Sequence, residues 1–97
     1  MTIQFENAPF TSASGSCLRG YIKTTYDELV NVFGEPTKLK GDKVNVEWII
    51  EFSDGTVATI YDWKLSSVPM GVYDWHIGGF NHRAVELVNN CVPVPVA

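Results

Sequence analysis

The sequence predicts a single α+β domain in which two short helices pack on the aromatic face of an antiparallel β-meander. Three observations support this fold class. One segment carries clear helix-capping signals, another has the pattern of a β-hairpin, and the tripeptide Tyr-Asp-Trp ends a β-like run at 61–63 and again at 73–75. The 97 residues are enough for one hydrophobic core, so one domain covering 1–97 is expected. The expected order is strand, helix, three strands and helix.

The two ends of the chain are expected to lie outside the regular elements. Residues 1–16 contain Asn-Ala-Pro and a run of small polar residues, which predicts an irregular N-terminal arm. Residues 91–97 are expected to form an extended tail, because Val92-Pro93-Val94-Pro95-Val96 cannot be helical. A short strand is expected at 18–22, between the arm and the first helix.

The first helix is expected at 26–33. Thr25 is a good N-cap, and Glu28 three residues later completes a capping box. Gly34 can adopt the left-handed conformation that ends a helix, and Pro36 prevents its continuation. The apolar side of this helix consists of Tyr26, Leu29, Val30 and Phe33, which recur at helical spacing.

Residues 44–64 are expected to form the hairpin, because Asp54-Gly55 is a preferred pair for a two-residue type I′ turn. Such a turn would pair Phe52 with Val57 and place a largely apolar set of side chains on one face, against the helices. That set consists of Val46, Trp48, Ile50, Phe52, Val57, Thr59, Tyr61 and Trp63.

The last strand and the second helix follow from the same reasoning. A strand at 72–77 would add Tyr73, Trp75 and Ile77 to the aromatic face. Asn81 is a suitable N-cap for a helix at 82–90. The apolar side of that helix would consist of Ala84, Val85, Leu87 and Val88.

Composition and charge restrict the function classes. The net charge of −4 and the pI near 4.9 argue against general nucleic-acid binding. No signal peptide is visible, and no apolar run approaches the roughly 20 residues that span a bilayer, so a cytoplasmic location is expected. Cys17 and Cys91 are expected to be free thiols. No cofactor is expected, and no nucleophile signature such as GxSxG is present.

The first candidate site is the end of the last strand. A glycine pair there would let a ligand approach the backbone, and the following helix start would favour an anion. The candidate ligand-binding residues are Gly78, Gly79, Asn81, His82 and Arg83. A turn with left-handed glycines is the favoured interpretation of the glycine pair, and Arg83 could equally form a salt bridge with Glu86.

The second candidate site is the polar face of the sheet. In the expected register Glu47 faces Asp62, with Asp74 and His76 on the same face of the next strand. These four residues are weak candidates for a divalent-metal site or for acid–base catalysis. A solvated face without such a role is favoured, because the ligand spacing matches no motif. The three tryptophans are assigned to the core, which disfavours a base-stacking platform.

Several stretches form a pattern along residues 18–90. They are Arg19-Gly20-Tyr21-Ile22, Thr25-Tyr26-Asp27-Glu28-Leu29-Val30, Phe33-Gly34-Glu35-Pro36, Glu47-Trp48-Ile49-Ile50-Glu51-Phe52, Asp54-Gly55-Thr56-Val57-Ala58-Thr59-Ile60-Tyr61-Asp62-Trp63-Lys64, Trp75-His76-Ile77-Gly78-Gly79 and Arg83-Ala84-Val85-Glu86-Leu87-Val88. In these stretches the chain resembles a family of small tailed-phage proteins, including those of cyanophages and actinobacterial phages, that has no established activity. The resemblance implies a viral origin and assigns no catalytic residues.

Three functional hypotheses follow. The leading one is a small, non-catalytic phage accessory protein of the host cytoplasm that binds and modulates or inhibits a host protein, for host takeover or against host defence. The second is a protein that sequesters an anionic small molecule or signalling nucleotide at the Gly78-Gly79 segment. The third is a metal-dependent hydrolase on the acidic sheet face. Homodimerisation through the strand at 18–22 remains an open alternative.

Overall fold

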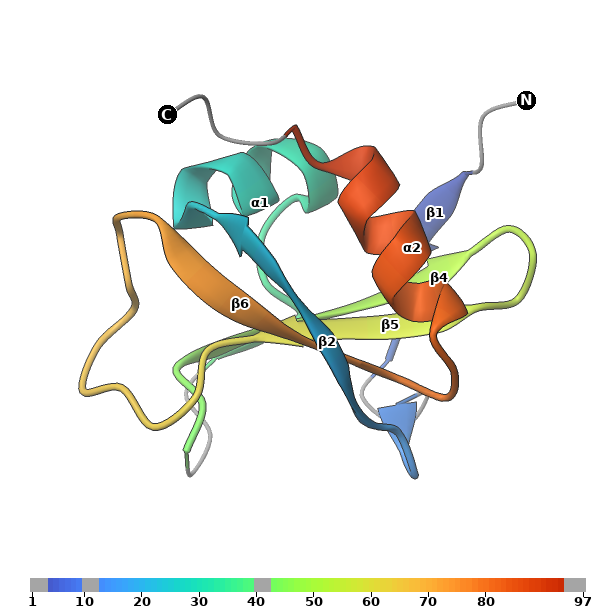
Figure 1. Ribbon diagram of the computed structural model, residues 1–97, viewed down its shortest axis with the longest axis horizontal. Coiled ribbons are helices and arrows are strands. Elements are labelled where there is room, and N and C mark those ends of the chain that lie inside the picture. The colour runs from blue at the N-terminus through green and yellow to red at the C-terminus, as the bar shows by residue number, and fades with distance from the viewer. Residues whose placement is uncertain (1–3, 10–12, 40–42, 94–97) are drawn as a thin grey trace.

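The computed structural model describes residues 4–9, 13–39 and 43–93, and it confirms the α+β fold class. Both helices lie on one face of a single antiparallel sheet of six strands (Figure 1). The strands are β1 (Phe5–Asn7), β2 (Cys17–Thr24), β3 (Lys38–Leu39), β4 (Val46–Phe52), β5 (Val57–Tyr61) and β6 (Tyr73–Gly79), and the helices are α1 (Tyr26–Phe33) and α2 (Arg83–Cys91).

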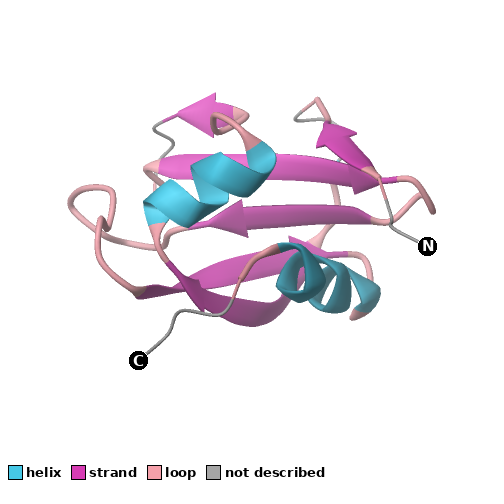
Figure 2. Cartoon of the chain, turned by 90° about the horizontal axis from the view of Figure 1, so that it is seen from above, coloured by secondary structure: helices cyan, strands magenta, loops and turns pink. Residues whose placement is uncertain are grey.

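The predicted meander β4-β5-β6 forms the centre of the sheet. The strand order is β1-β4-β5-β6-β2, with the short β3 also paired to β4. Strands β1 and β3 lie along the same edge of β4, at 50–52 and 46–47 respectively, and β2 forms the opposite edge of the sheet. The arm predicted to be irregular therefore contains a strand, and the tail from 94 onward lies outside the described residues. Figure 2 shows both helices in front of the same face of the sheet.

The hydrophobic core lies between this face and the two helices. Trp48 and Trp75 are fully buried there, and their rings pack edge to face with centroids 5.7 Å apart. Their indole N–H groups donate to the carbonyl oxygens of Gly34 at 2.8 Å and Thr24 at 3.1 Å. Other buried side chains of this core include Ile22, Leu29, Phe33, Ile50, Phe52, Ile60, Ile77, Leu87 and Val88.

The predicted caps of α1 are confirmed. The Thr25 hydroxyl accepts the N–H of Glu28 at 3.2 Å. Gly34, at φ +83°, ends the helix and donates its N–H to the carbonyl of Val30 at 2.8 Å. In α2 the N-cap position belongs to His82, although Asn81 does cap the helix start through its side-chain oxygen, which accepts the N–H of Arg83 at 3.0 Å.

The register predicted for the hairpin is wrong by one residue. Glu51, not Phe52, lies opposite Val57. The loop has three residues, 53–55, because Phe52 donates its N–H to the carbonyl of Thr56 at 2.8 Å and accepts the N–H of Gly55 at 2.9 Å. Gly55 adopts φ +90°, as the third position of such a loop requires. The Asp-Gly pair therefore fits a three-residue loop as well as the two-residue turn.

This shift turns every side chain of β5 to the other face relative to β4. Ala58 and Ile60 face the helices, in place of the predicted Thr59 and Tyr61. Trp63 was also predicted to lie in the core, but the residue is 41% exposed. Asp62, which was expected to face outward, is fully buried on the helix side.

The buried Asp62 carboxylate ties the end of β5 to the start of β4. One oxygen accepts the backbone N–H groups of Asn45 at 2.8 Å and Val46 at 3.2 Å. The other accepts the side-chain amide of Asn45 at 2.6 Å. The Asp62 carboxylate therefore accepts three hydrogen bonds, and these offset the free-energy cost of burying its charge.

We predict that Asp62→Ala lowers the free energy of unfolding by about 2 to 4 kcal/mol, because two backbone N–H groups lose their acceptor at about 1–3 kcal/mol each. Chemical denaturation of both proteins measures the change. Asp74→Ala is the matched control, since Asp74 is exposed and pairs with Lys23 at 3.8 Å. Asp74→Ala is expected to lower the free energy of unfolding by less than about 1 kcal/mol. Equal losses for the two variants would contradict the role assigned to Asp62.

Candidate functional site

The glycine pair of the first candidate site lies inside strand β6 and not in a turn. Gly78 is paired with Thr59 of β5 and Leu18 of β2, and Gly79 occupies the next position of the same ladders. Neither glycine is among the described residues with positive φ. The left-handed turn considered from the sequence is therefore not formed at this position.

Both glycines are required by close packing. A Cβ atom on Gly78 would overlap the hydroxyl oxygen of Thr59. A Cβ atom on Gly79 would lie 2.6 Å from the Cβ of Ala84 and 3.1 Å from the carbonyl oxygen of Val57. The missing side chain of Gly79 lets α2 lie close to the sheet, and Thr59 occupies the space beside Gly78, so neither glycine leaves open space for a ligand above the backbone.

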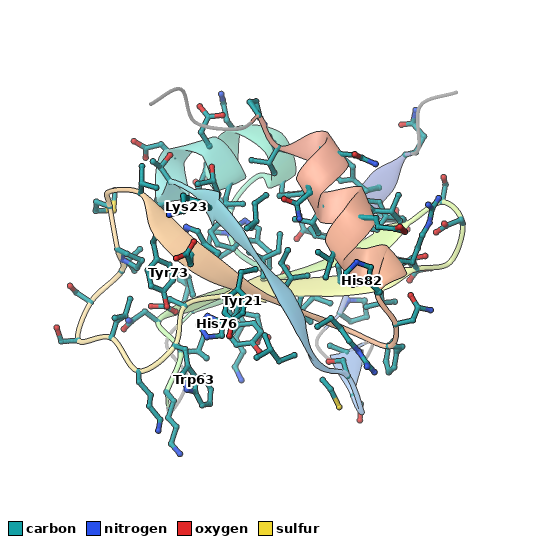
Figure 3. All side chains as sticks on the ribbon, viewed as in Figure 1. Tyr21, Lys23, Trp63, Tyr73, His76 and His82 are labelled. Atoms are coloured by element: carbon teal, nitrogen blue, oxygen red, sulfur yellow. The ribbon has the colours of Figure 1, made fainter. Side chains whose placement is uncertain are left out.

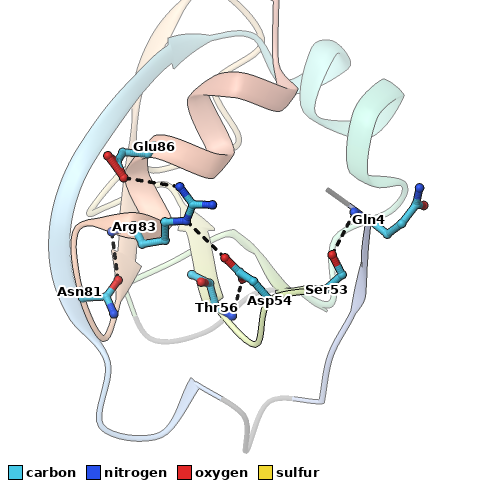
Figure 4. Close-up of polar contacts among 7 residues, drawn as sticks. All are labelled: Gln4, Ser53, Asp54, Thr56, Asn81, Arg83 and Glu86. Carbon is cyan, nitrogen blue, oxygen red and sulfur yellow. Dashed lines mark hydrogen bonds and ion pairs between the residues drawn. The ribbon is translucent and has the colours of Figure 1, made fainter. Parts of the chain in front are cut away.

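The charged group of this segment is already bound by acidic side chains of the chain itself. The Arg83 guanidinium donates to Asp54 at 3.2 Å and lies 3.9 Å from Glu86 (Figure 4). Hydrogen bonds from Thr56 hold the pKa of Asp54 below its usual value, and Arg83 adds to this effect. Arg83 therefore links the hairpin loop to α2, while His82 is exposed beside it.

The four weak metal candidates are not brought together. Asp62 lies on the helix side, whereas Glu47, Asp74 and His76 lie on the other face of the sheet. Burial raises the pKa of Glu47, and the charge of Lys38 opposes this effect. Within residues 4–9, 13–39 and 43–93, no group of three His, Cys, Asp or Glu side chains could hold a metal ion.

The structure instead assembles a row of rings on the sheet surface that faces away from the helices. We call this surface the aromatic face and define it by Tyr21, Tyr61, Trp63 and His76. Figure 3 labels Tyr21, His76 and Trp63 of this set. Tyr21, His76 and Tyr61 are direct neighbours across β2, β6 and β5. The centroid of the His76 ring lies 5.0 Å from that of Tyr21, 5.3 Å from that of Tyr61 and 6.4 Å from that of Trp63.

The outer rings of this row are accessible to a partner. Tyr21 is 52% exposed and Trp63 is 41% exposed, in contrast to the fully buried Trp48 and Trp75. Leu18, also exposed, extends the same surface along β2. Exposed apolar clusters of this kind mark binding surfaces more often than do scattered apolar side chains.

Two lysines flank the exposed tryptophan. The Nζ atoms of Lys43 and Lys64 each lie 5.9 Å from the centroid of the Trp63 ring. A hydrogen bond of 2.8 Å from the N–H of Lys64 to the carbonyl of Lys43 holds the two backbones side by side. Lys64 adopts φ +56° and is the single non-glycine residue with positive φ in the described part of the chain. Such backbone conformations are uncommon and concentrate at functional sites.

His76, at the centre of the row, is a neutral ring at neutral pH. Burial lowers the pKa of His76, and the charge of Asp62 only partly offsets this effect. Its Nδ1 atom is buried and has no hydrogen-bond partner among the described residues. The imidazole therefore contributes to the aromatic face mainly through ring contacts.

Sequence reasoning missed the aromatic face because it assigned Tyr61 and Trp63 to the core. The signal that could have located this face is the segment Ser-Asp-Gly, which also suits a three-residue hairpin loop.

Cys17 and Cys91 are free thiols, as predicted.

Comparison of the chain with protein-family models, curated proteins and solved structures finds no match. No helix in the parts of the chain that the structure describes is long and apolar enough to cross a bilayer.

We predict that Gly79→Ala lowers the free energy of unfolding by about 1–3 kcal/mol, because the added methyl group would be forced against Ala84 and Val57. Gly71→Ala is the control, since a Cβ there meets nothing within 4 Å and φ is not positive. Its effect is expected to stay within about 0.5 kcal/mol. Thermal or urea unfolding of the two variants tests the packing role, and an unchanged stability of Gly79→Ala would refute it.

We predict that stability falls as the pH drops below about 7. The unfolded chain binds a proton at His76 near the usual pKa of 6.5, whereas the folded chain binds it only at lower pH. The free energy from keeping this ring neutral is therefore present above pH 6.5 and is lost as the pH falls toward the folded pKa. Urea titrations at several pH values should show that the free energy of unfolding decreases less with falling pH for His76→Phe than for the wild type. An NMR titration midpoint of His76 above 6.5 would contradict the prediction.

Proposed function

We propose that this protein is a non-catalytic binding protein that acts on a host factor, and that the aromatic face is its binding surface. The observation that carries the proposal is the exposure of Tyr21 and Trp63 on a sheet face that neither α1 nor α2 covers. Tyrosine and tryptophan side chains supply much of the binding energy at interfaces, because they bury a large area with little loss of conformational entropy.

The chemistry of the aromatic face supports binding and not catalysis. A general base of the Ser-His-Asp type is oriented by a hydrogen bond to its second nitrogen. The buried Nδ1 of His76 has no such partner in the described residues, so nothing there orients it as a base.

The proposal that the partner is a host factor rests on the resemblance to small tailed-phage proteins. In that setting the protein would be an accessory factor of the host cytoplasm that binds and modulates or inhibits a host protein, including a defence protein. The Gly78-Gly79 segment is a less favoured location for ligand binding, since its space is filled by Thr59 and Ala84.

We predict that Tyr21→Ala combined with Trp63→Ala lowers the affinity for the host factor at least tenfold, because these rings form the exposed part of the surface. Affinity capture from infected cells compares the variants with the wild type, and the proteins and nucleic acids in each eluate are quantified. Leu39→Ala is the control, because Leu39 is 68% exposed but lies on the edge strand β3.

The expected result is a factor that is retained by the wild type and by Leu39→Ala but is lost with the double variant. Retention of the same factors by all three proteins would refute the aromatic face as the binding surface. Loss on Arg83→Ala alone would relocate the site to the start of α2.

A further inference from the structure

Two lysines at the corner of the aromatic face around Trp63 form no ion pair with a carboxylate of the described residues. The ion pairs in the described parts of the chain are Lys23 with Asp74 and Arg83 with Asp54 and Glu86. Lys43 and Lys64 take part in none of these, and both are exposed beside the Trp63 ring. Two lysine ammonium groups therefore lie next to an exposed indole.

Two carboxylates on the same face, Asp74 and Glu47, lie under the influence of other lysines, whereas Glu51 and its partner Glu6 lie at the far end of β4. Asp74 lies 3.8 Å from Lys23, and the charge of Lys38 acts on Glu47. Other carboxylates, such as those in the first turns of α1 and α2, are on helices that cover the opposite face. Because fields between exposed charges are screened within about 10 Å in 0.1 M salt, the local charge at Trp63 matters more than the net charge of −4.

We propose that the aromatic face binds single-stranded nucleic acid. Bases would stack on Trp63 and Tyr21, and backbone phosphates would lie beside Lys43 and Lys64. This inference rests on the proposed function only in using the same surface. Stacking on exposed rings combined with phosphate contacts to lysines is the mode by which sheet surfaces hold single strands without sequence preference.

The lysine pair favours a nucleic acid over a protein as the ligand of this corner. Tyrosine and tryptophan are enriched at protein interfaces, but lysine is depleted there. Phosphate contacts, in contrast, are made mainly by lysine and arginine. The left-handed backbone at Lys64 and its hydrogen bond to the carbonyl of Lys43 hold the backbones of both lysines next to Trp63.

A single strand fits this surface better than a duplex does. Tyr21 on β2 and Trp63 beyond β5 lie on either side of the central His76 ring, so the rings form a row across the sheet. Stacking requires the flat face of an unpaired base, which a duplex does not present. The sequence disfavoured a base-stacking platform because Trp63 was assigned to the core. Trp63 is exposed, so this reason no longer applies to it.

The test is a titration of the full chain into a fluorescein-labelled 12-mer of deoxythymidine, followed by anisotropy at several salt concentrations. Contacts to two phosphates predict a slope of about −1.4 for log K against log salt, since each phosphate contributes about −0.7 for a single strand. Tyr21→Ala is expected to weaken binding roughly 5- to 150-fold through the loss of stacking on one base. Quenching of Trp63 fluorescence should accompany binding, because Trp48 and Trp75 are buried.

Charge-matched variants make the test specific. Lys43→Gln combined with Lys64→Gln should remove most of the salt dependence, whereas Arg83→Gln should leave the affinity unchanged although it also removes a positive charge. Circular dichroism confirms that each variant is folded. Retained affinity and salt slope in the double-lysine variant would overturn the proposal.

Two further outcomes would also overturn the proposal. Absence of binding to the 12-mer in low-salt buffer would refute nucleic-acid binding. If Tyr21 and Trp63 are still needed to capture a host protein in that case, the proposed function stands without nucleic-acid binding. Binding of thymidine monophosphate as tight as that of the 12-mer would identify a free nucleotide, and not a strand, as the ligand.

Discussion

The loop at 53–55 determines which face of β5 meets the helices, and most of the surface chemistry depends on it. Gly55 adopts a positive φ that allows a three-residue loop, and Asp54 accepts the N–H of Thr56 at 2.9 Å within it. A strand has a side-chain period of two, so one additional loop residue exchanges its two faces. As a result Asp62 reaches the backbone of Asn45, and Trp63 is turned outward.

The sequence predicted the elements that depend on local interactions. The caps of α1 at Thr25 and Gly34 are formed within a few residues of each other, so their signals are readable directly. The register of the hairpin was not readable in the same way. Both faces of β5 carry apolar side chains, with Ala58 and Ile60 on one and Val57 and Tyr61 on the other, so hydrophobicity does not distinguish the two registers.

The remaining differences arise from contacts between distant segments. Strands β1 and β3 have only three and two residues, and they exist through pairing with β4, which no local pattern specifies. The Gly78-Gly79 pair resembles a loop in sequence, but Thr59 and α2 require small residues at that point of β6. Gly78 and Gly79 were therefore assigned to a ligand, although their main role is to let neighbouring elements approach closely.

The doubled Tyr-Asp-Trp shows how the same three residues are used in opposite ways. In the copy at 73–75 the tryptophan is in the core and Asp74 is outside, where it pairs with Lys23. In the copy at 61–63 the carboxylate is inside and Trp63 is outside. Because Tyr61 lies opposite His76, Asp62 meets the same face as Trp75, and the two copies are out of phase. The buried carboxylate of the first copy thus anchors the strand end from which Trp63 and Lys64 extend, so the hydrogen bonds of Asp62 also position the exposed corner of the aromatic face.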